Sequence, residues 1–394
     1  MVVFAWIGFV SSLVLVIIIA RKNLPLALLC GTIVLGLFTL PFVELGKAML
    51  GPFLDLSVLI LALAVGFIPM IGGVMKDSGQ MDNLVNNLRI GKRGIMALAP
   101  ALMGLLPMPG GALFSAPVLE KAGQGVADDL KVTINIWFRH LLILVYPLSS
   151  DLIASVKIAN QNLYVTIAHF VPVFIIALIL GYVFFIRKIH GSIAYTGAFS
   201  LKNLLVPLVI IMVAPVIDFT FKIIPVFTIK ETATLLGVIA AFVLSLLLNP
   251  VKLDLSRTIV KMKPWNFSLI IIGLFMFLNV FKASKVALLI AAIPLSPLLL
   301  CVIAGFIVGV ATGRVLLPAS VIFPIYLSTR TFTPVTFAII YVSIYFGYVL
   351  SPVHPCVAMT CEYFKSPVKN MIRRLALPTG IIMILILVLT LLLR

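Results

Sequence analysis

Long apolar stretches separated by short polar ones dominate the 394-residue chain. Most of these stretches approach the roughly 20 residues that an α-helix needs to cross a bilayer, and the length of the chain allows about 10 to 12 crossings. The pattern leaves no room for a large soluble domain. The apolar runs occupy approximately residues 3 to 20, 24 to 43, 54 to 75, 94 to 107, 131 to 147, 163 to 186, 203 to 219, 232 to 249, 267 to 281, 288 to 311, 333 to 350 and 372 to 393.

Composition supports this interpretation. Hydrophobic residues make up 62% of the chain and charged residues 10%, with a mean hydropathy of +1.26. These values lie outside the range of soluble domains and are typical of a polytopic membrane protein. The run from Met1 to Ala20 has no basic leader and is followed at once by Arg21 and Lys22. We therefore expect a retained first helix and no cleaved signal peptide.

The net charge of +17 comes from basic residues in short clusters between the apolar runs. Such clusters lack the basic stripe of a nucleic-acid-binding surface, so we expect no nucleic-acid partner. Cytoplasmic loops of membrane proteins are enriched in Lys and Arg, which predicts that these clusters face the cytoplasm at the inner (plasma) membrane. The clusters are Arg21/Lys22, Lys76 with Arg89/Lys92/Arg93, Arg187/Lys188/Lys202, Lys252/Arg257/Lys261/Lys263 and Lys365/Lys369/Arg373/Arg374.

The number of crossings between successive cytoplasmic clusters must be even, and this condition predicts two segments that do not cross. The run at 94 to 107 is expected to turn at Pro107 to Gly111 and return through Ala112 to Val118 as a re-entrant hairpin. The same reasoning makes 288 to about 329 a second hairpin, turning near Ala311 to Arg314. The predicted fold class is an all-α polytopic membrane protein with about ten transmembrane helices, two hairpins and both termini outside.

Two of the crossing runs are interrupted by proline at matching places. Pro147 interrupts the run that starts at Lys131, and Pro352 and Pro355 interrupt a run in the second half. Proline removes a backbone donor and clashes with the preceding turn, so each break frees backbone carbonyls and amides that need a partner inside lipid. A bound solute or ion is one such partner. The alternative is an ordinary proline kink that neighbouring side chains or water satisfy.

The predicted elements follow the same order in residues 1–200 and in residues 201–394. Each half has three helices, a hairpin, a broken helix and a last helix, and the halves start on opposite sides of the membrane. This order predicts an inverted repeat, the architecture of secondary transporters whose substrate lies near the midplane between discontinuous helices. The first helices of each half would form a scaffold, and the hairpins and broken helices the moving part. Carriers of this design often pair through the scaffold, so a homodimer is one expectation.

Three segments also carry a family resemblance: PMPGGALFSAP at 107–117, the Trp137 to His140 run that leads to Pro147, and SPVHPCVAMTCEYF from Ser351 to Phe364. They resemble a family of uncharacterised prokaryotic integral membrane proteins, a domain of unknown function grouped with the ion transporter superfamily. That superfamily also holds the gluconate permeases and the divalent anion:sodium symporters. The resemblance covers essentially the whole chain and implies a binding site at the hairpin tips and helix breaks: Pro107 to Ser115, Ala311 to Pro318, Pro147 to Asp151 and Ser351 to His354.

Arg139 and Arg314 lie inside the predicted membrane segments. A charged side chain there is costly unless it faces protein, water or a ligand. Guanidinium groups near helix N-termini favour a small anion such as a carboxylate or an oxyanion. The alternatives are an ion pair of Arg139 with Asp151 or Glu362, and a position of Arg314 near the membrane surface that it reaches by snorkelling.

The other candidate groups are histidines, hydroxyls and one carboxylate. His140 and His354 can change charge near neutral pH and would couple proton movement to transport, the alternative being two hydrogen-bonded structural histidines. Asp151 would instead hold Na⁺ with the carbonyls freed at the Pro147 break. The predicted substrate-binding residues are Pro109, Gly110, Gly111, Ser115, Arg139, His140, Ser149, Ser150, Thr312, Gly313, Arg314, Ser351 and His354, and the predicted ion-coupling residues are Asp151, His140 and His354.

No cofactor is predicted beyond Na⁺ or H⁺ as the coupling ion, and no other metal site. The spacing of Cys356 and Cys361 matches neither a zinc knuckle nor a redox CxxC motif, so these thiols, like Cys30 and Cys301, are expected to be buried and inert. Gly111 is expected to bring bare backbone up to the solute, because glycine has no side chain.

These patterns predict a secondary active transporter that moves a small anionic solute by alternating access, coupled to a H⁺ or Na⁺ gradient, with membrane lipid as its surroundings. An intramembrane enzyme is the first alternative, but the sequence has no HExxH motif, and Ser115 has no recognisable catalytic partner. An ion channel is the second alternative, because hairpins also build pores. Paired helix breaks favour alternating access, so we expect no enzymatic activity.

Overall fold

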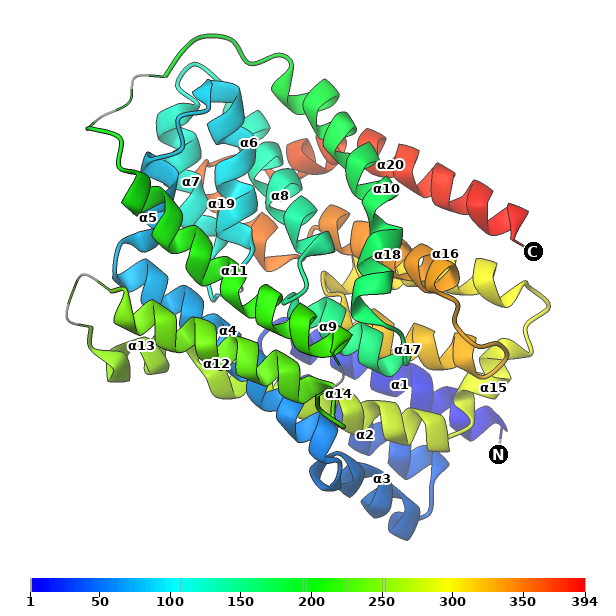
Figure 1. Cartoon of the computed structure of the whole chain (residues 1–394). Helices are drawn as coiled ribbons and strands as arrows, with labels where there is room; N and C mark the ends of the chain where they lie inside the picture. Colours follow the sequence, from blue (N-terminus) through cyan, green and yellow to red (C-terminus); the bar gives the residue numbers. More distant parts are fainter. Residues whose placement is uncertain are drawn as a thin grey trace.

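The computed structural model describes residues 2–106, 108–193, 195, 197–224, 226–249, 251 and 253–393. Every regular element in these ranges is helical, which confirms the predicted all-α class. The predictions that fall on Pro107, at the first hairpin tip, and on Lys252, in a basic cluster, lie outside the described residues. Figure 1 shows the arrangement of the helices.

The helices of the described chain follow one order twice. The first series is α1 (Val2–Ala20), α2 (Leu24–Thr39), α3 (Phe42–Leu54), α4 (Leu56–Asp77), α5 (Gln80–Asn86), α6 (Gly91–Gly104), α7 (Ala112–Ala122), α8 (Asp128–Val145), α9 (Ser150–Ile158) and α10 (Leu163–Gly181), which continues into a π-helical turn, η1 (Tyr182–Ile186). The second series is α11 (Leu201–Ile223), α12 (Glu231–Leu247), α13 (Leu255–Met262), α14 (Pro264–Ala283), α15 (Val286–Ala291), α16 (Pro297–Thr312), α17 (Leu316–Leu327), α18 (Pro334–Leu350), α19 (Pro355–Tyr363) and α20 (Val368–Leu392).

Among the described residues, seven helical segments are long and apolar enough to cross a membrane, and the pair of α8 and α9, bent by 45° at its break, provides an eighth candidate. The chain is therefore a multi-pass membrane protein. The helices α18 and α19 together form one of the seven candidates, whereas α2, α12, α16 and α17 are shorter apolar helices. The total of about ten crossings predicted from the sequence counts α2 and α12 as spans, and this finer topology stays a prediction.

Local chemistry explains where the important helices begin and end. The helix α8 ends at Val145, two residues before Pro147, because proline and the residue before it do not continue a helix. The helix α19 begins at Pro355, where a missing N–H costs nothing in the first turn. Gly313 ends α16 with a left-handed φ of 59°, a conformation that favours glycine.

The short helices α3 and α13 correct the boundaries expected from the sequence. The sequence predicts one apolar segment at 24 to 43 and the next from about 54. In the structure, the separate helix α3 lies between α2 and α4. The helix α13 occupies the corresponding place between α12 and α14. Both helices expose much of their length, which includes charged residues as well as apolar ones, and a search for uniformly apolar runs misses such helices.

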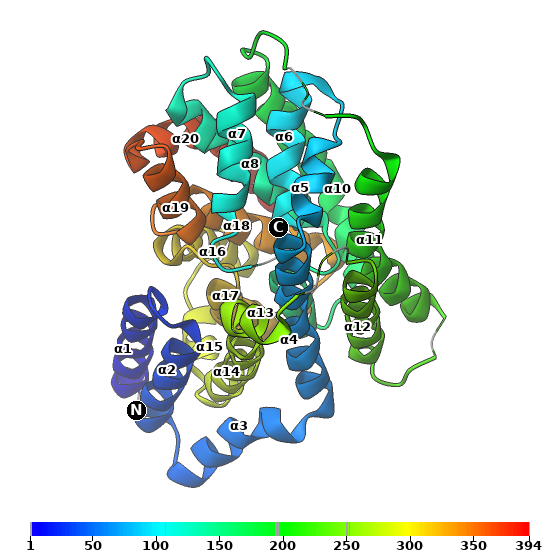
Figure 2. The same cartoon turned by 90° about the vertical axis from the view of Figure 1, so that its left-hand side faces the viewer.

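The helices pack into two groups. In the first, α4 packs against α14, α12 and α13, and α14 packs reciprocally against α2 and α3; α1 lies on α2, and α11 on α12. In the second, α6 packs against α7 and α8, and α16 packs against α17 and α18; α10 contacts α18, and α20 contacts α8. Figures 1 and 2 show α1 to α3 with α14 in the lower part of the molecule and α6 to α8 with α19 in the upper part. We call these groups the scaffold group and the hairpin group.

A buried carboxylate fastens the two groups near α10 and α11. Asp218 of α11 is fully buried and forms an ion pair with Lys222 at 2.8 Å. It also accepts hydrogen bonds from the hydroxyls of Tyr164 in α10, at 2.5 Å, and Thr234 in α12, at 2.6 Å. A buried carboxylate is tolerated when it has an ion-pair partner and hydrogen-bond donors of this kind.

Replacing this carboxylate tests the packing. Asp218→Ala leaves Lys222 without its counter-ion and is expected to lower the free energy of unfolding by about 3 kcal/mol or more, measured as a fall in the melting temperature of the purified protein. Glu120→Ala is the matched control, since Glu120 is exposed and also accepts a tyrosine hydroxyl, that of Tyr363. Equal stability of both variants would contradict the packing described here.

Candidate functional site

A cavity of about 540 Å³ lies between the scaffold group and the hairpin group. Its volume is within the range of roughly 300 to 1,000 Å³ that is typical of small-molecule sites. The scaffold wall is largely apolar, with Val65 from α4 and Phe267, Ile270 and Ile271 from α14, and its one charged residue is Lys22 between α1 and α2. The opposite wall consists of the helix breaks of the hairpin group and carries the other polar and charged lining residues.

Four helices of the described chain begin at this cavity. The residues that precede the first turns of α7, α9, α17 and α19 are Gly111, Ser149, Val315 and His354, and all four line the cavity. Only Ser149 caps its own helix with a side chain, accepting from the N–H of Leu152 at 3.5 Å. The N-termini of these four helices, with their positive dipole ends, therefore lie at the cavity.

Arg139 of α8 is held between the two helices of the first hairpin. Its side chain is 4% exposed, and its Nη1 donates to the backbone carbonyl of Gly111 at 3.0 Å. A Cβ added to Gly111 would lie 2.3 Å from Nη2 of Arg139, and one added to Gly104 would lie 2.5 Å from the backbone oxygen of Arg139. The two glycines thus make room for this arginine, whereas the sequence analysis assigned the space at Gly111 to the solute.

Among the described residues, neither Arg139 nor Arg314 forms an ion pair with a carboxylate. The alternative expected from the sequence, an ion pair of Arg139 with Asp151 or Glu362, is therefore not observed in this part of the chain. Arg314 donates to the backbone carbonyl of Ala20, at the end of α1, at 3.1 Å. It also interacts electrostatically with Asp151 across the cavity. With Lys22, which also lines it, the cavity therefore has three cationic side chains and one carboxylate.

An aromatic cluster forms another part of the wall. The rings of His140 and His354 lie edge to face, with centroids 4.8 Å apart, and Tyr348 lies 4.2 Å from His354 and 5.2 Å from His140. The hydroxyl of Tyr345 donates to the backbone carbonyl of His140 at 2.6 Å, which fixes the end of α8 against α18.

The structure brings most of the predicted site residues together. Those that line the cavity are Pro109, Gly110, Gly111, Arg139, His140, Ser149, Ser150, Asp151, Gly313, Arg314 and His354.

Three predicted hydroxyls lie outside the cavity lining and are used within the protein. Ser115 donates to the side-chain oxygen of Asn135 at 2.6 Å, Thr312 donates to the carbonyl of Val308 at 2.8 Å, and Ser351 donates to the carbonyl of Val310 at 2.6 Å. Their assignment to the substrate remains a prediction.

The sequence analysis missed several lining residues. Tyr348 and Cys356 flank the second break and line the cavity, as do Lys22 and the apolar residues of α4 and α14. Tyr348 and Cys356 lie within or beside the proline-rich segment, so proximity to the break was an available signal. No sequence signal identified the apolar scaffold residues, because nothing in the sequence distinguishes them from other core positions.

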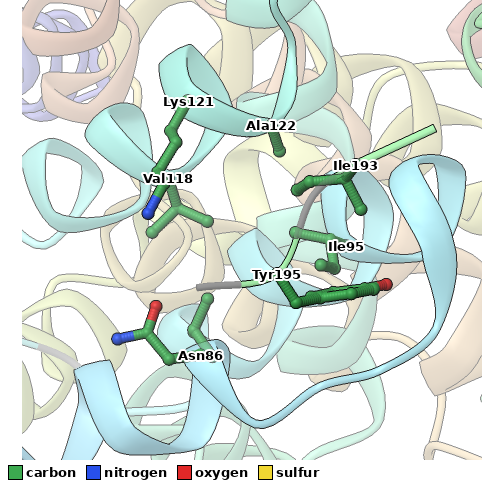
Figure 3. A pocket seen from close by; sticks show the side chains of 8 residues that line it. Asn86, Ile95, Val118, Lys121, Ala122, Ile193 and Tyr195 are labelled. Atoms are coloured by element: carbon green, nitrogen blue, oxygen red, sulfur yellow. The ribbon is translucent and has the colours of Figure 1, made fainter. Parts of the chain in front are cut away.

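Two other hollows fit the predicted site less well. The first, of about 70 Å³, lies between α5, α6, α7 and the segment after η1, with Asn86, Ile95, Lys121 and Tyr195 around it (Figure 3). It is too small for most solutes. The second, of about 790 Å³, lies at the ends of α16, α17 and α18, is lined by four threonines and Arg330, and includes no predicted site residue.

Glycine-to-alanine variants test how Arg139 is positioned. Gly104→Ala is expected to lower the melting temperature, because the new methyl group meets backbone and must separate α6 from α8, at a cost of about 1 to 3 kcal/mol. Gly380→Ala in α20 is the control, since a Cβ there meets nothing within 4 Å, and it is expected to be neutral or stabilising. A Gly104→Ala protein as stable as the wild type would refute the close approach.

The chain is similar over 89% of its length to the Alcanivorax borkumensis YdaH transporter, whose crystal structure is described as revealing an unusual topology. The likeness covers 87% of that chain at 13% identity, with a TM-score of 0.54. At this identity the likeness shows the fold alone. No curated protein matches the chain. The family model of DUF401, described as a protein of unknown function, matches residues 5–393. Membership of the ion transporter superfamily stays a prediction. The chain thus belongs to the DUF401 family.

Proposed function

We propose that this protein is a secondary active transporter that carries a small anionic solute, a carboxylate or an oxyanion, by alternating access. The observation that carries the proposal is the convergence of four helix N-termini and two arginines on one cavity between two helix groups. Helix N-termini bind anions through their free N–H groups and their dipoles. This function makes the chain a carrier and not an enzyme.

The proposed anion lies on the polar wall, with its oxygens toward the first turns of α7, α9, α17 and α19. Arg139 and Arg314 approach it from the first and second halves of the chain. A guanidinium group offers two parallel N–H donors to a carboxylate or phosphate-like group, and such charge-assisted bonds are stronger than neutral ones. Arg139 needs no rearrangement, because Gly111 already fixes its side chain at the cavity.

Movement of the hairpin group along the scaffold group would expose the site alternately to the two sides of the membrane. The repeated helix order and the reciprocal packing of α4 and α14 support an inverted repeat, with halves at residues 1–200 and 201–394. In that topology α2 and α12 also cross, giving about ten spans with two re-entrant hairpins, α6 with α7 and α16 with α17. Apart from Lys22, the scaffold side chains that line the cavity are apolar and offer no competing polar partner to a site that moves past them.

Several polar contacts between the groups must open during such a movement, among them the bonds of Tyr164 to Asp218 and of Arg314 to Ala20. A further one is an ion pair. Lys157, in the last turn of α9, forms an ion pair with Glu231 at the start of α12, with 2.8 Å between Nζ and Oε1. Both groups also bond to the hydroxyl of Ser57 in α4. Both side chains retain some exposure, 20% for Lys157 and 16% for Glu231, so water can replace each partner when they separate.

We assign coupling to a H⁺ or Na⁺ gradient through Asp151. This carboxylate lines the cavity in the first turn of α9, and none of the hydrogen bonds and ion pairs found among the described residues includes it. A bound proton or sodium ion would neutralise its charge and reduce its repulsion of the anion. The cost of leaving it ionised beside an anion is the physical basis of the coupling.

The orientation proposed is the one that the basic clusters predict, with both termini outside. Residues from three clusters meet at one end of the molecule: Arg93 donates to the backbone carbonyls of Ile189 and Arg187, and Lys261 forms an ion pair with Asp77 beside Lys76. A common basic end is what the positive-inside rule requires. The inner membrane as the location, and a homodimer formed through the scaffold group, stay predictions.

Ligand-dependent stability tests the anion site. The purified protein is screened with acetate, succinate, citrate, gluconate, phosphate and sulfate, with and without Na⁺, at about pH 5.5 and about pH 7.5. A bound anion at about 100 times its dissociation constant is expected to stabilise the fold by about 2.7 kcal/mol. Dependence on Na⁺ or on pH identifies the coupling ion.

Matched variants locate the response. Arg139→Ala and Gly111→Ala are both expected to weaken anion binding about tenfold or more, the second because its methyl group, 2.3 Å from Nη2 of Arg139, displaces the guanidinium. Arg257→Ala, at an exposed position of α13, is expected to bind as the wild type does. A shift that persists in Arg139→Ala, or the absence of a shift with every anion, would refute the site.

A further inference from the structure

Three metal-ligating side chains meet on the wall of the central cavity. One ring nitrogen of His140, one ring nitrogen of His354 and Sγ of Cys356 all lie within 4.8 Å of one another. His140 comes from the last part of α8, whereas His354 and Cys356 lie at the start of α19. All three residues line the cavity, so an ion can reach them from its interior.

Both histidines are already held in the tautomer that a metal site needs. Nδ1 of His140 lies 2.5 Å from the backbone carbonyl of Ile136, and Nδ1 of His354 lies 3.3 Å from that of Tyr348. A carbonyl can only accept, so Nδ1 donates in both contacts, and Nε2 of each neutral ring keeps its lone pair. Metal-binding histidines commonly donate their second nitrogen to a backbone carbonyl in this way.

The free nitrogens have no other use in the described part of the chain. No hydrogen bond of those residues involves Nε2 of either ring. Packing of two rings edge to face accounts for the 4.8 Å centroid distance, but it does not account for a thiol at the same point. Two imidazoles with one thiol form a ligand set that prefers a borderline transition metal to Na⁺, Mg²⁺ or Ca²⁺.

Distances and charge then define the site. Ligands of a tetrahedral zinc ion lie about 3.5 Å apart, so groups within 4.8 Å of one another need to close by up to about 1.3 Å, which side-chain torsions can supply. Arg139 interacts with Cys356, and Arg314 and Asp151 line the same cavity. A divalent cation bound to one thiolate adds positive charge beside two guanidinium groups and one carboxylate. An anion from the cavity would offset that charge as the fourth ligand.

We propose that His140, His354 and Cys356 bind a borderline divalent transition metal such as Zn²⁺, with an open fourth coordination position that faces the cavity. Three protein ligands with one open position are characteristic of metal sites that also bind water or a solute. The proposal concerns metal binding alone and does not depend on the transport of an anion.

Cobalt serves as the spectroscopic probe. The purified full-length protein is titrated with Co²⁺ in the absence of added carboxylates, and Zn²⁺ is then added as a competitor. We expect one Co²⁺ per chain, a thiolate-to-cobalt charge-transfer absorption band, and loss of that band on addition of Zn²⁺. Since the thiol must lose its proton to bind, affinity is also expected to rise with pH.

Variants with close controls assign the ligands. Cys356→Ser is expected to lose the charge-transfer band, whereas Cys361→Ser, at a buried cysteine of the same helix, is expected to keep it. His140→Ala and His354→Ala are expected to weaken binding about tenfold or more. His169→Ala is their control, because His169 is exposed and its Nδ1 makes the same bond to the carbonyl four residues earlier, at 2.8 Å.

The wild-type protein is sufficient to overturn the proposal. If folded wild-type protein shows no saturable Co²⁺ binding, or if the charge-transfer band survives in folded Cys356→Ser, the site is wrong. The anion screen contains no transition metal, so a failure of this experiment leaves the proposed transport function untouched, and a failure of the screen leaves the metal site untouched.

Discussion

Unpaired backbone groups inside a membrane must be covered by protein or must face water or a ligand, and this constraint organises the molecule. The chain interrupts its helices at two hairpin tips and at two proline-rich breaks, and each interruption leaves amides at the start of a new helix. All four new helices, α7, α9, α17 and α19, begin at one cavity. The breaks thereby share one cavity, and the positive dipole ends of the four helices favour negative charge there.

The remaining architecture separates these interruptions from lipid. The helices α8, α10, α18 and α20 surround them within the hairpin group, while α4 and α14 close the cavity from the scaffold side with apolar residues. Apart from Lys22, the scaffold residues that line the cavity are apolar, and the bond of Arg314 to the carbonyl of Ala20 is one contact that the proposed sliding movement would break. The ion pair of Lys157 and Glu231 joins the two groups at a partly exposed position, where separation costs little.

Sequence reasoning succeeded where one residue type determines the local backbone. Proline chemistry predicted the breaks at Pro147 and Pro355, and apolar length predicted a multi-pass helical protein. It could not determine what a polar side chain contacts across the fold: the hydroxyl of Ser115 is bound to Asn135, and Gly111 makes room for Arg139, not only for a solute. The convergence of Cys356 with His140 was equally hidden, since more than two hundred residues separate them and no spacing rule covers ligands brought together by packing alone.

Counterflow into proteoliposomes tests the central claim most directly, because it detects a carrier whatever the coupling ion. Vesicles containing the purified protein and loaded with unlabelled acetate, succinate, citrate, gluconate, phosphate or sulfate are given the same labelled anion outside. The account predicts saturable, transient accumulation of at least one anion that depends on the internal anion and is lost in Arg139→Ala. Entry that ignores the internal anion and persists in Arg139→Ala, or no protein-dependent entry of any of these anions, would contradict it.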